Sequence, residues 1–448
     1  MTLIYQGDWG ACRVTTSRSS SGRAAVSGFA ILYLAMFIAA TGNFAMMSLF
    51  PTIARVSGIP DALMVAVQSV SAALSIFTTP FWAARSDLVG RKPVILTGIA
   101  GFTLASLLTA GAIYVASHRL VPVMVAVAGL MGSRALFGCV GMAAFPAIQA
   151  HIADETTPAQ RTRSLASIFS ANGLGAVLGP ALAPFLLLPV IGLAGPQAIF
   201  ALVGLSVLIA AATRLRFRPV ERRADRPARV PKLQVLRTPS VWPFVAYLAV
   251  LSGCQAANLQ MIGFVVIDTT RLNPIAAQPF AGLVLMAGAM AAVTIQLGVL
   301  RLIRAAPPIL MIGGTGLVIL GNLLMSMAHG YPLVALAFVL SSAGYAFGVP
   351  AAVSGASLAN PAAQRGTVTG LVMAASSSGL LFAPVLAMLL YRHSPAMTFL
   401  VIAAVLAGLL IRIVPRCAQS LARLVPPRIG DFASPGASAL QADDAKRD

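Results

Sequence analysis

The chain has 448 residues, of which 58% are hydrophobic and only 10% are charged. A soluble domain has about a quarter of its residues charged, so this composition excludes an ordinary water-soluble fold. The formal net charge of +19 would suggest a nucleic-acid partner, but the charges stand almost entirely between long apolar blocks, so we expect no nucleic acid.

Apolar blocks near or beyond the roughly 20 residues that cross a bilayer as a helix recur along the chain. They predict an all-α integral membrane protein with twelve transmembrane helices in two six-helix bundles, residues 28–213 and 241–414. The predicted spans are 28–50, 63–82, 93–115, 121–148, 165–188, 197–213, 241–269, 275–302, 309–328, 332–353, 366–390 and 395–414. Residues 1–27 and 415–448 are predicted as cytoplasmic tails, and residues 214–240 as a basic cytoplasmic linker.

The distribution of basic residues predicts the orientation of these spans. The two tails and the loops on their side carry 26 Lys and Arg, whereas the opposite loops carry only Arg55, Arg119, Arg271 and Arg392. Loops rich in Lys and Arg stay in the cytoplasm, so both termini are predicted to be cytoplasmic. We expect the cell membrane as the location, which is the inner membrane in a bacterium.

The two halves repeat each other at a constant offset of 204 residues. Pro146 matches Pro350, the run 159–161 matches 363–365, and Gly175 and Pro180 match Gly379 and Pro384. Two pseudo-symmetric halves of this kind usually place a substrate site between them, near the middle of the bilayer.

The residues that carry metal and redox chemistry are sparse. The four cysteines (12, 139, 254 and 417) show no paired spacing, so we expect free thiols, no metal site and no cofactor. The four histidines (118, 151, 329 and 393) fall in loops or at helix ends, which disfavours a membrane-embedded enzyme.

The loop after the second span, residues 80–93, carries Asp87, Gly90, Arg91 and Lys92. This spacing resembles the signature of the major facilitator superfamily between helices two and three, although Ala83 and Leu88 depart from it. The resemblance implies that the loop controls opening and closing through charge contacts. Ordinary cytoplasmic basic residues beside one solvated Asp are the alternative.

The fourth span carries Arg134, Gly138 and Gly141, which resembles a second pattern of the family. An Arg this deep raises the free energy of insertion by about 2.5–3.5 kcal/mol, so it should face the interior and have partners. The resemblance implies a role in substrate binding or proton coupling. A hydrogen-bonded contact between helices is the alternative.

The fifth span carries Gly175, Gly179 and Pro180 in a run similar to one found in drug/proton antiporters of the family, but Ala183 and Pro184 replace its final glycines. Two glycines four residues apart also permit close packing of a neighbouring helix. The run therefore leaves antiport and simple packing open.

Proton coupling generally needs a carboxylate within the membrane, and candidates are few. The first span has Thr41, Gly42 and Asn43 and no acid. Asp61 precedes the second span, where we expect it to cap the helix. Asp268, near the outer end of the seventh span, is the remaining candidate, with Arg271 as its possible ion-pair partner.

Other polar groups fall inside the spans, and the sequence leaves open whether each contacts substrate or another helix. They are Asn43, Gln68, Arg134, Asn172, Gln255, Asn258, Gln296, Tyr345 and residues 376–378. A cavity with one Arg and no clear buried acid favours neutral, amphipathic or anionic organic molecules.

The resemblance implies a monomeric secondary active transporter that works by alternating access. The leading hypothesis is proton-coupled efflux, with a small molecule, protons and membrane lipid as partners. An importer of a small organic solute, such as a nutrient or siderophore, stays open because Asn43 replaces an acid and the antiporter run is incomplete. A receptor that transports nothing is also open, and an absence of flux would favour it.

Overall fold

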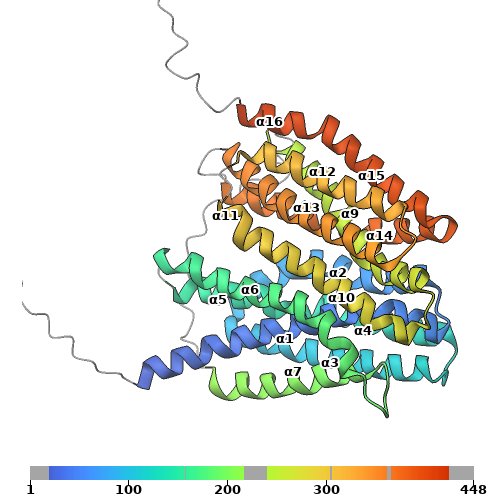
Figure 1. Ribbon diagram of the computed structural model, residues 1–448. Helices are drawn as coiled ribbons and strands as arrows, with labels where there is room; N and C mark the ends of the chain where they lie inside the picture. Colours follow the sequence, from blue (N-terminus) through green and yellow to red (C-terminus); the bar gives the residue numbers. More distant parts are fainter. Residues whose placement is uncertain (1–19, 157, 216–239, 303–304, 361–364, 423–448) are drawn as a thin grey trace, which may run out of the picture.

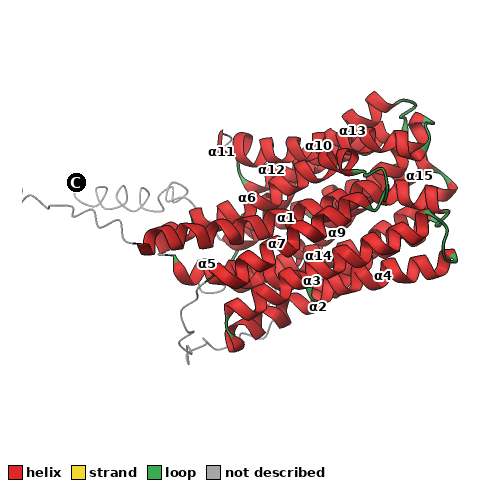
Figure 2. Ribbon diagram, turned by 90° about the horizontal axis from the view of Figure 1, so that it is seen from below, coloured by secondary structure: helices red, strands yellow, loops and turns green. Residues whose placement is uncertain are grey.

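The protein is described by a computed structural model that covers residues 20–156, 158–215, 240–302, 305–360 and 365–422. The described part is nearly all helix, and the helices run side by side along one axis (Figures 1 and 2). Most of the predicted linker and of both predicted tails lies outside the described residues.

The helices follow the predicted spans but extend beyond them at many ends. The N-terminal half comprises α1 (Ser20–Ser57), α2 (Asp61–Val89), α3 (Arg91–Ser117), α4 (Val123–Cys139), the 3₁₀ turn η1 (Gly141–Ala143), α5 (Ala144–Glu155), α6 (Pro158–Leu182), the 3₁₀ turn η2 (Ala183–Leu186) and α7 (Gly195–Arg214). The C-terminal half comprises α9 (Trp242–Thr270), α10 (Pro274–Thr294), the π-helical turn η3 (Ile295–Val299), α11 (Leu300–Leu302), α12 (Pro307–Ser326), α13 (Tyr331–Leu358), α14 (Arg365–His393), α15 (Pro395–Arg412) and α16 (Val414–Ala422).

Length and hydropathy suit these helices to a bilayer. In the described residues, eleven helical segments are long and apolar enough to cross a membrane. The 29-residue α14 occupies the remaining predicted position and completes twelve. A helix satisfies its own backbone hydrogen bonds, which hydrocarbon cannot do. The predicted fold class, an all-α membrane protein of twelve helices in two halves, is therefore confirmed.

The fourth predicted span differs from its prediction, because 121–148 is not one continuous helix. α4 ends at Cys139, and α5 begins after the η1 turn. Pro146 lacks the N–H that would bond to the carbonyl of Met142, four residues earlier. Its repeat partner Pro350 lies inside α13, which is continuous. A proline at this repeat position therefore does not by itself break the helix. The break between α4 and α5 is a feature of the N-terminal half.

The two halves repeat a packing contact as well as a sequence. On α6, Gly175 lies against the backbone of α1 at Ala40 and Thr41. Its repeat partner on α14, Gly379, lies in the same way against the backbone of α9 at Gly253. Figure 1 shows the halves as two groups of helices, coloured blue to green and yellow to red.

The start of α1 and the end of α16 lie at one end of the bundle, which we call the proximal end (Figure 1). The opposite end, where α1 ends and α2 begins, is called the distal end and is the predicted extracellular side. Contacts between the halves gather near it. The Thr52 hydroxyl donates to the carbonyl of Pro274 at 3.3 Å, and Pro51 packs against Gly263.

Close packing at Gly179 generates a test of the fold. A Cβ there would lie 2.5 Å from the carbonyl oxygen of Thr41 and 2.8 Å from the amide nitrogen of Ala45. Because both atoms belong to the α1 backbone, Gly179→Ala should destabilise the protein by about 1–3 kcal/mol. A thermal melt of the purified protein measures the effect.

Gly111→Ala is the matched control, because a Cβ on that α3 residue meets nothing within 4 Å. It should leave stability unchanged or raise it by about 0.5–1 kcal/mol, the usual gain for replacing a helical glycine. Equal melting temperatures for the two variants would contradict the close packing of α6 on α1.

Candidate functional site

A charged cluster joins the two halves at the distal end. Nη2 of Arg55, on α1, lies 2.9 Å from the Asp61 carboxylate of α2 and 3.1 Å from the Asp268 carboxylate of α9. The Tyr391 hydroxyl of α14 donates to Asp268 at 3.0 Å. We call these four residues the distal cluster; Arg55 and Asp61 belong to the N-terminal half, and Asp268 and Tyr391 to the C-terminal half.

Two sequence expectations are corrected at this cluster. Arg271 was one partner that Asp268 could take, but Asp268 pairs with Arg55. α9 ends at Thr270, and Arg271 takes the left-handed conformation that follows. Asp61 was expected to precede the second span and cap it, but it is the first residue of α2 and pairs with Arg55. Its carboxylate still lies in the first turn, where it favours the helix dipole. Both carboxylates therefore pair with Arg55, which the sequence analysis counted only among the four basic residues of the loops opposite the tails.

The ion pairs of the distal cluster are partly exposed to solvent. The side chains of Arg55 and Asp268 are 35% and 37% exposed. Ion pairs of this exposure contribute about 0–1 kcal/mol each. The cluster therefore biases the two halves toward contact without locking them.

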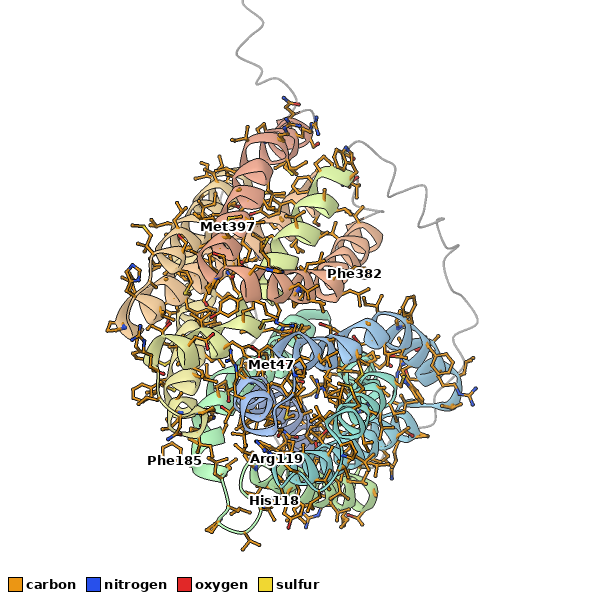
Figure 3. All side chains as sticks on the ribbon, turned by 90° about the vertical axis from the view of Figure 1, so that its right-hand side faces the viewer. Met47, His118, Arg119, Phe185, Phe382 and Met397 are labelled. Atoms are coloured by element: carbon orange, nitrogen blue, oxygen red, sulfur yellow. The ribbon has the colours of Figure 1, made fainter. Side chains whose placement is uncertain are left out.

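A small pocket lies between the halves, below the distal cluster. It is formed by helices α1, α2 and α9 and is lined by Met47, Phe50, Met64, Val65, Gln68, Gln260 and Phe264. Figure 3, viewed toward the distal end, shows Met47 where the N-terminal half faces the C-terminal half. On α9, Gln260, Phe264 and Asp268 are four residues apart and share one face, so the pocket begins one turn below the cluster.

The pocket combines apolar walls with two unused amides, and we call it the amide pocket. The Oε1 atoms of Gln68 and Gln260 are both buried without a hydrogen-bond partner in the described residues. An amide offers donors and an acceptor without charge. The cavity measures about 10 Å³, room for roughly one water molecule, so a larger solute requires the halves to separate.

Arg134 lies elsewhere, inside the N-terminal half. Its side chain is 5% exposed, and Nη2 donates to Asn43 Oδ1 at 2.8 Å and to Ser71 Oγ at 3.0 Å. The guanidinium carbon lies 4.8 Å from the centre of the Phe137 ring. Nε has no partner in the described residues, and the group borders a second cavity between α1, α3, α4 and α7. Two predicted candidates, Asn43 and Arg134, thus form one site away from the amide pocket.

The signature loop ties helices of the N-terminal half together at the proximal end. Arg91 lies 2.6 Å from Asp87 and 3.0 Å from Asp154, which joins α2, α3 and α5. Gly90 has φ of +97°, a value that few other residues adopt, and it lets α3 start directly after α2. The Lys92 ammonium donates to the carbonyl of Ala212 in the last turn of α7.

The other predicted polar groups are dispersed. Asn258 and Tyr345 are buried together in the C-terminal half, where the amide donates to the hydroxyl at 3.2 Å. Gln255, Asn172 and Gln296 are exposed on the bundle. Ser376 bonds to Ser252 at 2.6 Å between α14 and α9.

The sequence analysis did not single out Arg55 and Tyr391 of the distal cluster, nor any lining residue of the amide pocket except Gln68. Gln260 and Phe264 are among the missed lining residues. The signal for these two was present in α9, where Gln260, Phe264 and Asp268 follow a spacing of four residues. The partnership of Arg55 with Asp268, 213 residues apart, had no local signal.

Comparison with known proteins places the chain in a family. The model of the Major Facilitator Superfamily matches residues 32–313. Multidrug resistance protein 2 of Bacillus subtilis (strain 168) is 25% identical over 158 residues, which are 35% of this chain and 36% of that protein. The match therefore spans about a third of that relative's length.

Solved structures share the fold at low identity. A mutant of the nucleoside transporter NupG has a TM-score of 0.70 at 11% identity, covering 87% of this chain and 99% of that one. A bacterial homologue of the human lysosomal transporter Spinster, in an inward-facing and occupied conformation, has a TM-score of 0.63 at 13% identity, covering 90% and 96%. The family model covers more than half of the chain and the solved structures share its fold, so this chain belongs to the Major Facilitator Superfamily.

Proposed function

We propose that the protein is a proton-coupled exporter of neutral or amphipathic organic molecules, which bind between the two halves at the amide pocket. The observation that carries this proposal is the pair of unused, uncharged amides from opposite halves, Gln68 and Gln260, among Met and Phe side chains. A ligand that forms hydrogen bonds to both amides contacts both halves. Movement of the halves apart exposes this ligand to solvent, and their closure encloses it.

The chemistry of the pocket favours some solutes over others. Its lining has no formal charge, so a charged ligand would lose hydration without gaining a counter-charge there. A flat apolar group suits Phe50 and Phe264, and a hydroxyl or amide on the ligand suits the glutamines. Neutral amphipathic molecules therefore fit better than cations or anions.

The direction of transport is proposed from the relatives and from the first span. The multidrug relative supports export, but the match covers about a third of its length. The nucleoside transporter shares only the fold. Import of a small neutral solute remains the second candidate, favoured by Asn43 in the position where antiporters of the family carry an acid.

Asp268 is the acid best placed for proton coupling. Its partner Arg55 belongs to the other half, so the ion pair must break when the distal end opens. Loss of a cationic partner makes protonation of a carboxylate easier. The counter-charge beside Asp268 is therefore present in one conformation and absent in the other, which is the change that coupling requires. By contrast, Asp61 keeps Arg55 within its own half.

The amide pocket can be tested with Gln68→Leu and Gln260→Leu. Each variant removes one hydrogen bond to a bound solute, which is worth about 0.5–1.5 kcal/mol, so affinity should fall by about two- to tenfold. A thermal-shift titration with neutral aromatic amides and alcohols, beside matched carboxylates and quaternary ammonium compounds, measures the change.

Gln255→Leu is the matched control, since Gln255 lies on the same helix but is exposed and outside the pocket lining. It should leave affinity within about twofold. Binding of cations in preference to neutral compounds, or an equal loss in all three variants, would rule out the amide pocket as the binding site.

The coupling role is tested by Asp268→Asn in proteoliposomes. The variant should lose accumulation driven by a pH gradient while still equilibrating solute across the membrane, because only the titrating group is removed. Loss of the ion pair should also raise the ratio of distal-open to distal-closed molecules about two- to fivefold, equivalent to about 0.5–1 kcal/mol. Spin-label distances across the distal end report that ratio.

Asp61→Asn is the control for this experiment, because its ion pair lies within one half. It should keep gradient-driven transport and show no increase in distal opening. Full accumulation by Asp268→Asn would exclude Asp268 as the coupling acid.

We also propose the cell membrane as the location, with both termini in the cytoplasm, from the excess of 26 basic residues on one side over four on the other. A fluorescent protein fused after Asp448 should fold and fluoresce in a bacterial host, whereas alkaline phosphatase fused there should be inactive. The opposite pattern would invert the topology and place the distal cluster in the cytoplasm.

A further inference from the structure

The cavity beside Arg134 carries an uncompensated positive charge. Arg134 is 5% exposed, and in the described part of the chain no carboxylate pairs with it. Its hydrogen bonds to described residues both leave from Nη2, to the neutral side chains of Asn43 and Ser71. A guanidinium cannot deprotonate in a protein, so the charge persists in the interior of the bundle. A buried charge without a partner is strongly destabilising.

The walls of the cavity present further hydrogen-bond donors. Nε of Arg134 is buried and unpartnered within the described residues. Asn43 Oδ1 accepts from Arg134, which assigns the other amide atom as an NH₂ group, and no bond from it is seen in the described part. The Ser106 hydroxyl also borders the cavity and bonds to no described residue. Three residues with hydrogen-bond donors, Asn43 of α1, Ser106 of α3 and Arg134 of α4, therefore line one small space.

The size of the space limits its occupant. The cavity measures about 10 Å³, which holds roughly one water-sized particle. Phosphate, sulfate and the carboxylate of an organic solute are too large. A water molecule could satisfy Nε, but it would leave the guanidinium charge without a counter-charge.

We propose that this cavity is a binding site for a halide ion, with chloride as its occupant in the cell. The ion would accept from Arg134 Nε and from the Ser106 hydroxyl, and it would neutralise the guanidinium. Because its two ligands come from different helices, it would fasten α3 to α4 within the N-terminal half. All lining residues belong to that half, so the proposal does not depend on the substrate or on the amide pocket.

The experiment compares thermal melts of the purified full-length protein in sodium gluconate, sulfate, chloride and bromide at constant ionic strength. The melting temperature should rise with chloride and bromide in a saturable way, and it should not rise with sulfate or gluconate. Arg134→Gln should abolish the halide-dependent shift. Ser106→Ala keeps the guanidinium and loses one donor to an anion, so it should raise the half-saturating chloride concentration about tenfold.

Ser48→Ala is the matched control, because Ser48 is fully buried on α1 but bonds to Ala45 and does not line the cavity. Its chloride dependence should equal that of the wild type. If Arg134→Gln fails to fold, the Ser106→Ala and Ser48→Ala pair decides the question. A wild-type melting temperature that is the same in gluconate and chloride would mean a water molecule only and would overturn the proposal. An equal half-saturating concentration for Ser106→Ala and the wild type would overturn it too.

Discussion

The absence of hydrogen-bond partners in hydrocarbon is the constraint on which this structure depends. It forces the backbone into helices, and it makes every polar side chain within the spans either find a protein partner or face a space that can hold a ligand. Many polar groups here find a protein partner, as the Tyr247 hydroxyl does in the Thr315 hydroxyl. Oε1 of Gln68, Oε1 of Gln260 and Nε of Arg134 do not, and their residues line the two cavities. The amide of Gln278 is also buried without a partner in the described residues, but it lines neither cavity. A missing hydrogen-bond partner therefore marks a candidate functional residue only where the residue also lines a cavity.

The two cavities have different consequences for movement. The amide pocket has walls from both halves, so its shape must change when the halves move apart. The Arg134 cavity has walls from one half only, so a rigid movement of that half leaves it intact. A solute bound in the first can be released by alternating access, whereas an ion in the second stays with its half. This difference is why we propose the amide pocket, and not the Arg134 cavity, as the substrate site.

Sequence patterns predicted the fold well and the site incompletely, for one physical reason. Hydropathy is a local property, so the spans, the repeat of Gly175 in Gly379 and the burial of Arg134 could all be inferred from short stretches. The break between α4 and α5 could not, because Pro350 sits in the same repeat position without breaking α13. The partner of Asp268 could not be inferred from the sequence either. Arg271 is near Asp268 in the sequence, whereas Arg55 comes close to Asp268 only because the two halves pack together. Contacts between halves are the least local feature of the chain, and they are where the candidate site lies.

The ion pairs of the distal cluster contribute little free energy because they are partly exposed to solvent. Weak ion pairs suit two halves that have to separate. A buried ion pair between the halves would hold them together by several kcal/mol once formed and would leave two unpaired charges when broken. The partly exposed Arg55 and Asp268 avoid both extremes, since water replaces each partner when they separate. The halves also meet through Pro51 against Gly263, a contact that involves no charge. Distal closure thus rests on several small terms, so binding of a solute in the amide pocket one turn below needs only a modest free energy to shift it.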